Sequence, residues 1–126
     1  MAKNDPNPVI DWLPEPEAHN YPAALSYLSL ICEPSLAEAR VQSLRDATMA
    51  VFKAKDVFRA SGLSLLGISN SHVKKNTDKI EDGKALSPIL LVRDTAQGRV
   101  IVADGYHRLC AVYQYHEDAE IPCKIV

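Results

Sequence analysis

The sequence predicts an α+β fold, in which a helical hairpin precedes a small mixed sheet of about four strands with flanking helices. Apolar residues recur at helical spacing before residue 48, whereas after it short apolar runs of strand length alternate with helical segments. Composition changes at the same point. Residues 1–48 hold three basic residues, seven acidic residues and six of the eight prolines, against eleven basic and nine acidic residues in 49–126. We therefore expect one compact unit, with an arm and helical hairpin over 1–48 and the main domain over 49–126.

The hairpin is expected over residues 20–47. Asn20 is a good helix cap and Pro22 suits a first turn, so the first helix should begin there. Pro34 should end it, and a second helix is expected over residues 35–47. The apolar stripe of the first helix is expected to comprise Leu25, Leu28 and Cys32, widened by Tyr27, Leu30 and Ile31. The proline-rich residues 1–19 predict an extended arm, anchored by its apolar residues between positions 9 and 13.

The rest of the chain alternates strands and helices. Ser69 or Asn70 should cap the polar helix in this region, and Gly62 and Gly83 should end two of the helices. If the last two strands are parallel, the helix between them makes a right-handed crossover. The expected elements are strands at 49–53, 89–93, 99–103 and 121–126, a turn at 94–98, and helices at 55–61, 71–82 and 105–116.

Composition excludes several classes of function. The net charge of −2 argues against a protein that coats nucleic acid through a broad basic surface. No apolar run approaches the roughly 20 residues that cross a bilayer, so no membrane partner is expected. The N-terminus lacks the apolar stretch of a signal peptide, and the three cysteines form no CxxC pair. We expect a cytoplasmic protein with reduced thiols, two of them buried, and no metal site.

The stretch most suggestive of chemistry runs from Asp104 to Ala111, where a strand ends and a helix begins at once. Free backbone N–H groups and the positive end of the helix dipole lie at such a start. His107 and Arg108 occupy the same first turn, where a cation is unfavourable unless an anion compensates it. Gly105 would let a phosphate approach the backbone. The alternative is that Arg108 pairs with Asp104 and that Gly105 only makes a turn.

This stretch, Asp-Gly-Tyr-His-Arg-Leu-Cys-Ala, resembles the G-x-[HR]-R-x-x-A box of the ParB/sulfiredoxin superfamily. The preceding Ile80, Gly83 and residues 88–93 (PILLVR) are similar to the S-I…G…P-I-x-V-R stretch of ParB N-terminal domains. The closing residues 121–126 (IPCKIV) resemble the I-P-V-x-V strand of that fold. The resemblance covers about residues 49–126 and leaves 1–48 uncovered.

The resemblance implies a nucleotide held by its phosphates at the box, since ParB proteins bind CTP there, sulfiredoxins bind ATP and an archaeal free-serine kinase binds ADP. It implies contacts from Gly105, Tyr106, His107 and Arg108. The helix before the strand hairpin adds candidates whose alternative is a solvated polar face: Ser71, Lys74, Lys75 and Thr77. A nucleoside di- or triphosphate with Mg²⁺ is the expected ligand.

Two residues are candidates for catalysis. Asp104 could help hold Mg²⁺ or act as a general base, its alternative being a plain helix cap, and His107 could move a proton. Sulfiredoxin chemistry is not expected, because Tyr106 stands where that branch has its cysteine. His72 and His116 have no partner at metal-ligand spacing, so we expect surface or cap residues.

Three functions follow from these residues. The first is nucleotide or phosphate binding, with transfer of a phosphoryl group to a small molecule as its enzymatic form. The second is a DNA nuclease using Asp104, His107 and a metal, which the near-zero net charge disfavours. The third is a non-enzymatic, nucleotide-gated module, with residues 20–47 as the surface for a homodimer or a protein partner. The sequence leaves open whether the chain is an enzyme.

Overall fold

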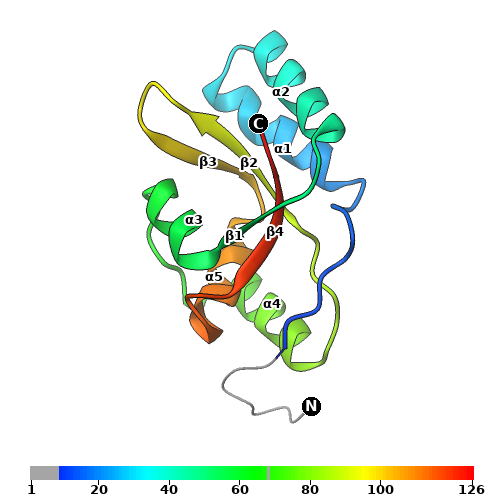
Figure 1. Cartoon of the computed structure of the whole chain (residues 1–126), viewed down its shortest axis with the longest axis vertical. Helices are drawn as coiled ribbons and strands as arrows, with labels where there is room; N and C mark the ends of the chain where they lie inside the picture. The colour runs from blue at the N-terminus through cyan, green and yellow to red at the C-terminus, as the bar shows by residue number, and fades with distance from the viewer. Residues whose placement is uncertain (1–8, 68) are drawn as a thin grey trace.

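The computed structural model describes residues 9–67 and 69–126, and within them it has an α+β fold with a four-stranded mixed sheet (Figure 1). The order of elements agrees with the sequence-based expectation. Their bounds are α1 Asn20–Ile31, α2 Pro34–Asp46, β1 Ala50–Lys53, α3 Ala54–Ser61, α4 Ser71–Glu81, β2 Ile89–Asp94, β3 Arg99–Asp104, α5 Tyr106–Tyr115 and β4 Glu120–Ile125.

The strands lie in the order β1-β4-β2-β3. β1 pairs antiparallel with β4, β4 pairs parallel with β2, and β2 forms an antiparallel hairpin with β3. β3 and β4 are therefore antiparallel and separated by β2, so the condition for a right-handed crossover between them is not met. The parallel pair is β2 and β4, because the β2–β3 hairpin reverses the chain before α5 carries it back to the other side of β2.

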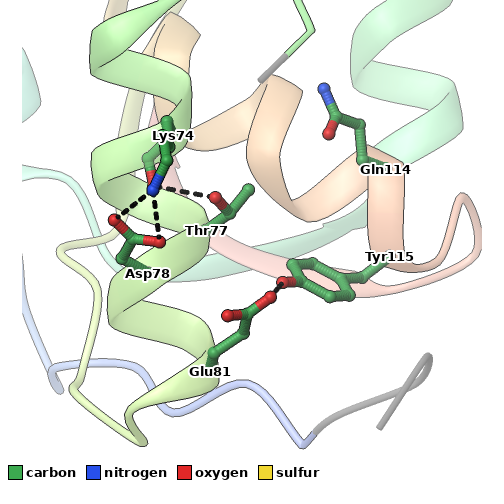
Figure 2. A pocket seen from close by; sticks show the side chains of 6 residues that line it. All are labelled: Lys74, Thr77, Asp78, Glu81, Gln114 and Tyr115. Atoms are coloured by element: carbon green, nitrogen blue, oxygen red, sulfur yellow. Dashed lines mark hydrogen bonds and ion pairs between the residues drawn. The ribbon is translucent and has the colours of Figure 1, made fainter. Parts of the chain in front are cut away.

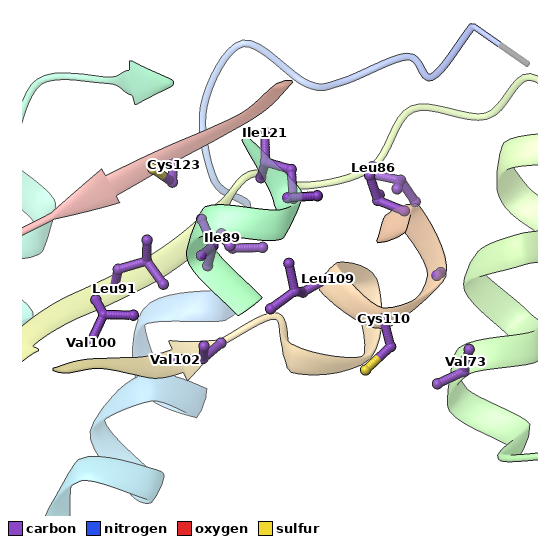
Figure 3. Close-up of a cluster of buried hydrophobic side chains, with 14 of the residues drawn as sticks. Val73, Leu86, Ile89, Leu91, Val100, Val102, Leu109, Cys110, Ile121 and Cys123 are labelled. Atoms are coloured by element: carbon purple, nitrogen blue, oxygen red, sulfur yellow. The ribbon is translucent and has the colours of Figure 1, made fainter. Parts of the chain in front are cut away.

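The central strand β2 is buried on both faces of the sheet over Ile89 to Val92, which explains its continuous apolar run. Ile89 and Leu91 point into a cluster beneath α3, α4 and α5, and Figure 3 shows this cluster around Leu109 and Ile121. The alternate residues of β2, Leu90 and Val92, pack with buried residues of α1 and α2 on the opposite face. The N-terminal hairpin is thus one of the two layers that cover the sheet.

Two expectations about α1 are wrong. His19, not Asn20, is the N-cap residue, and Asn20 lies inside the first turn with its side chain buried. The residues expected to widen the core-facing stripe face outward instead: Tyr27, Leu30 and Ile31. Leu30 is 83% exposed, because the helix turns Ala24 and Leu28 toward the sheet and α2.

The start of α4 follows the local signals in the sequence. Asn70 caps this helix, since its side chain accepts hydrogen bonds from the backbone N–H groups of His72 and Val73. Gly83 follows the helix with a φ of 72°, a conformation that suits glycine.

The arm reaches the main domain through Trp12, which forms a β-bridge with Leu86. Residues 1–8 lie outside the described part of the chain. Cys110 and Cys123 are buried thiols, as expected, and Cys32 is half-buried. Within the described residues, no helix has both the length and the apolar character needed to cross a bilayer.

Candidate anion-binding site

The start of α5 is set by Gly105, which has a φ of 105° between the last residue of β3 and the first of the helix. A Cβ atom at this position would overlap the side chain of Ile89, so only glycine fits. Gly105 was expected to let a phosphate approach the backbone, but the space beside its Cα atom is occupied by Ile89. Because glycine has no side chain, it also provides no cap for the N–H groups of the first turn of α5.

Arg108 is held by an ion pair with Asp104, four residues earlier, at an Nη2–Oδ2 distance of 2.9 Å. The two side chains are only 16% and 18% exposed. The same nitrogen also donates to the carbonyl oxygen of Pro88 at 3.4 Å. The structure therefore has the alternative arrangement from the sequence, in which Arg108 pairs with Asp104. Asp104 is the last residue of β3 rather than the helix cap.

Asn20 and Ser87 join this network, although neither was expected to belong to a site. The Asn20 Oδ1 atom accepts a hydrogen bond from the hydroxyl of Ser87 and a longer one, at 3.4 Å, from Arg108. Ser87 in turn accepts a bond from the backbone N–H of Glu17 at 3.0 Å. Both Asn20 and Ser87 are buried. The arm and α1 therefore help to position the arginine of the box.

A polar pocket of about 230 Å³ opens between α4 and the start of α5. Its cationic groups are Lys75, Lys79 and Arg108, and its one carboxylate is that of Asp104. The full lining is His72, Lys75, Asn76, Lys79, Asp104, Gly105, His107 and Arg108. His72, Asn76 and Lys79 were not expected here. Positions 72, 75, 76 and 79 include pairs three and four residues apart, which indicates one face of a helix, but only the packing of α4 on α5 shows which face meets the box.

The two histidines of the pocket lie against each other, with ring centroids 4.9 Å apart. His72 is an exposed residue in the first turn of α4, which confirms the expectation of a surface residue, and its ring also lies beside that of His107. Burial lowers the pKa of His107, and the neighbouring His72 and Arg108 lower it further. A neutral imidazole at this place can donate one hydrogen bond and accept another.

Lys74 and Thr77 lie on the opposite face of α4, where they line a separate pocket of about 340 Å³ (Figure 2). Lys74 pairs there with Asp78 at 3.1 Å, and the Thr77 hydroxyl donates to the Lys74 carbonyl oxygen at 2.7 Å. Tyr115 of α5 donates a hydrogen bond to Glu81 at 2.6 Å across this pocket. Of the lysines expected to contact phosphate, only Lys75 therefore faces the box.

Tyr106 and Ser71 do not line the pocket beside the box. The ring of Tyr106 packs against the core, and its burial, followed by the neighbouring Cys110, raises its pKa to about 12. Ser71 is an exposed residue in the first turn of α4.

The residues around the pocket do not suit a Mg²⁺ ion held by the protein. Within the part of the chain that the structure describes, Asp104 provides the only carboxylate that lines the pocket, and this carboxylate is paired with Arg108 among further cations. Across residues 9–67 and 69–126, no group of three His, Cys, Asp or Glu side chains is placed to hold a metal ion. The arrangement suits an anion instead.

Comparison of this chain with protein-family models, with curated proteins and with solved structures gave no match.

Proposed function

We propose that the chain binds a phosphate group at the start of α5, carried by a nucleotide or by another small phosphorylated molecule. The observation that carries the proposal is the charge around the pocket: Lys75, Lys79 and Arg108 stand against a single carboxylate. The N-terminal end of α5 adds the positive end of its dipole and the N–H groups that Gly105 leaves uncapped. A phosphate placed there would compensate the cations and accept hydrogen bonds from the backbone.

The size of the pocket supports the binding of a phosphate end rather than of an enclosed nucleotide. Pockets that enclose a drug-sized ligand usually measure at least about 300 Å³, whereas this one measures about 230 Å³ and is mainly polar. The base and sugar of a nucleotide would then lie outside it. The interpretation of residues 49–126 as a ParB/sulfiredoxin-like domain belongs to the same proposal. It is supported by the position of the box between a strand, β3, and a helix, α5.

Binding is better supported than catalysis. His107 is the residue through which a phosphoryl transfer would exchange a proton, because its imidazole lines the pocket and its pKa lies below the ordinary range. Asp104 is a weaker candidate for a general base, since its carboxylate is already paired with Arg108. A nuclease has less support, because one paired carboxylate does not provide the ligands of a catalytic metal.

The test is calorimetric titration of the chain with ATP, ADP, CTP, GTP and inorganic phosphate. Lys75→Ala and Lys79→Ala should each weaken binding roughly tenfold, since a charged hydrogen bond contributes about 1.5 kcal/mol. Lys74→Ala is the matched control, because it removes a lysine from the same helix but from the opposite face. No binding by the unmodified chain, or an equal loss with Lys74→Ala, would refute the proposal.

A further inference from the structure

One edge of the sheet is formed by β1, whose only strand neighbour among the described residues is β4. Val51 lies opposite Pro122, which has no N–H group, so these two residues form a pair without mutual hydrogen bonds. The neighbouring pair, Phe52 and Ile121, must therefore carry the hydrogen bonds. The backbone N–H of Ala54 donates to the carbonyl oxygen of Ala119 at 2.8 Å, which continues the alternation of hydrogen-bonded and non-hydrogen-bonded pairs.

It follows that the N–H and C=O groups of Val51 and Lys53 point away from the sheet. Adjacent side chains of β1 are open as well: Val51 is 55% exposed on one face and Phe52 is 39% exposed on the other. α3 begins directly after β1 and packs against β3, the strand at the far edge, so this helix leads away from β1.

An apolar groove of about 190 Å³ lies beside Phe52 on the α3 face of the sheet. Its lining comes from α3 and from all four strands and comprises Phe52, Asp56, Val57, Ala60, Leu91, Val100 and Ile125. An unpaired strand edge next to an apolar groove is the arrangement that accepts an added strand, whose backbone pairs with the edge while an apolar side chain covers the groove.

We propose that the added strand is β1 of a second copy of this chain, paired antiparallel about a two-fold axis at Phe52. In this register Val51 of each copy exchanges hydrogen bonds with Lys53 of the other, so all the outward backbone groups of the two residues are used. The two Phe52 rings then face each other at the mouth of the groove. The two sheets become one sheet of eight strands.

Charge and the number of hydrogen bonds favour this register over the registers with the two-fold axis one residue away. An axis at Lys53 would set the two lysines directly opposite each other, which is unfavourable. An axis at Val51 would leave the outward groups of Lys53 without a partner within the strand. In the proposed register Lys53 lies opposite Val51, and its amino group is within 4.0 Å of Asp118 in its own chain. Lys55, the next lysine, pairs with the same carboxylate at 2.7 Å.

Cysteine cross-linking of the full chain tests the register. Phe52→Cys should give a disulfide-linked dimer under mild oxidation, because facing residues in such a pair have Cα atoms about 4.5 Å apart. Val51→Cys is the matched control. Its two copies would be displaced by about 7 Å along the strands alone, which is too far for a disulfide. Equal cross-linking of both variants, or of Val51→Cys alone, would overturn the proposed register.

Sedimentation equilibrium over a dilution series tests the interface itself. The unmodified chain should show a concentration-dependent dimer, and Val51→Pro should return the mass to the 13.9 kDa of one chain. Proline at position 51 removes an outward N–H without removing a bond to β4, so circular dichroism should show an intact fold. A chain that stays monomeric throughout, or a dimer that survives Val51→Pro, would contradict the proposal. So would a dimer that dissociates with Leu30→Glu, since this result would locate the interface on the outer face of α1.

Discussion

Both faces of α4 carry lysine, but the charges around the lysines differ between the two faces. One face presents Lys74 to Asp78 of the same helix, in an exposed ion pair four residues apart. The other presents Lys75 and Lys79 to the start of α5, where the carboxylate of Asp104 is already held by Arg108. The charge of Lys74 is balanced by Asp78 of its own helix, beside a second carboxylate at Glu81, whereas the other face keeps an excess of positive charge. A lysine on a polar helix therefore becomes a candidate ligand only through the element that it faces.

The largest expected effect concerns the packing of Gly105 against Ile89, beside the pocket at the start of α5. Gly105→Ala should lower the free energy of unfolding by about 3 kcal/mol, because the new Cβ overlaps Ile89 and the backbone has a positive φ. Gly83→Ala is the control: its φ is also positive but nothing lies within 4 Å of the new atom, so about 1 kcal/mol is expected. Urea denaturation measures both. Equal losses would show that the contact with Ile89 contributes nothing.

A smaller difference is expected between the ion pairs on the two sides. Asp104→Asn should lower the free energy of unfolding by about 2 kcal/mol, because it leaves the guanidinium of Arg108 largely buried without its counter-charge. Asp78→Asn should cost less than about 0.5 kcal/mol, since Lys74 and Asp78 are both more than half exposed. If chemical denaturation gave similar values for the two variants, the contrast in burial would have no energetic consequence.

The smallest effect expected is the pH response of His107, in the pocket at the start of α5. Because folding lowers the pKa of His107, the folded state favours the neutral imidazole. Its contribution to stability is present above the unfolded pKa of about 6.5 and is lost as the pH falls through the folded value. Thermal unfolding between about pH 7.5 and about pH 5.5 should therefore show a smaller decrease in stability for His107→Asn than for the unmodified chain.

Phosphate provides the control for that measurement. An anion bound beside His107 favours the imidazolium, so excess phosphate should reduce the decrease in the unmodified chain. Identical pH profiles for the unmodified chain and His107→Asn would contradict the assigned environment of this imidazole.

Most of the elements followed from local patterns, because caps, prolines and apolar spacing act within a few residues. Asn70 at the start of α4 and Gly105 before α5 are examples. The strand that contains Ile89 and Leu90 was also predictable from its own residues, because they belong to an apolar run whose side chains are buried on both faces of the sheet. The direction of β4 relative to β3 had no local signal, because it depends on which side of the β2–β3 hairpin the last strand joins.

The site was only half predictable for the same reason. The box residues His107 and Arg108 were identified from a single stretch of sequence, but their partners come from elsewhere in the chain. His72 and Lys79 had a helical spacing that grouped them with Lys75, yet no pattern indicated that this face of α4 meets α5. Asn20 was assigned to a cap because that is its usual local role, whereas tertiary contacts with Ser87 and Arg108 determine its position.

The hydrogen bonds around Asn20 also bear on the order in which contacts form during folding. The bonds from Glu17 to Ser87, from Ser87 to Asn20 and from Arg108 to Asn20 join residues 67 to 88 positions apart, whereas Arg108 and Asp104 are one helical turn apart. Contacts between distant parts of a chain form late, because a long loop must close first. During synthesis the arm emerges first and meets its partners only after most of the chain has followed. The bond from Arg108 to Asn20 is therefore expected to form after the local ion pair between Arg108 and Asp104.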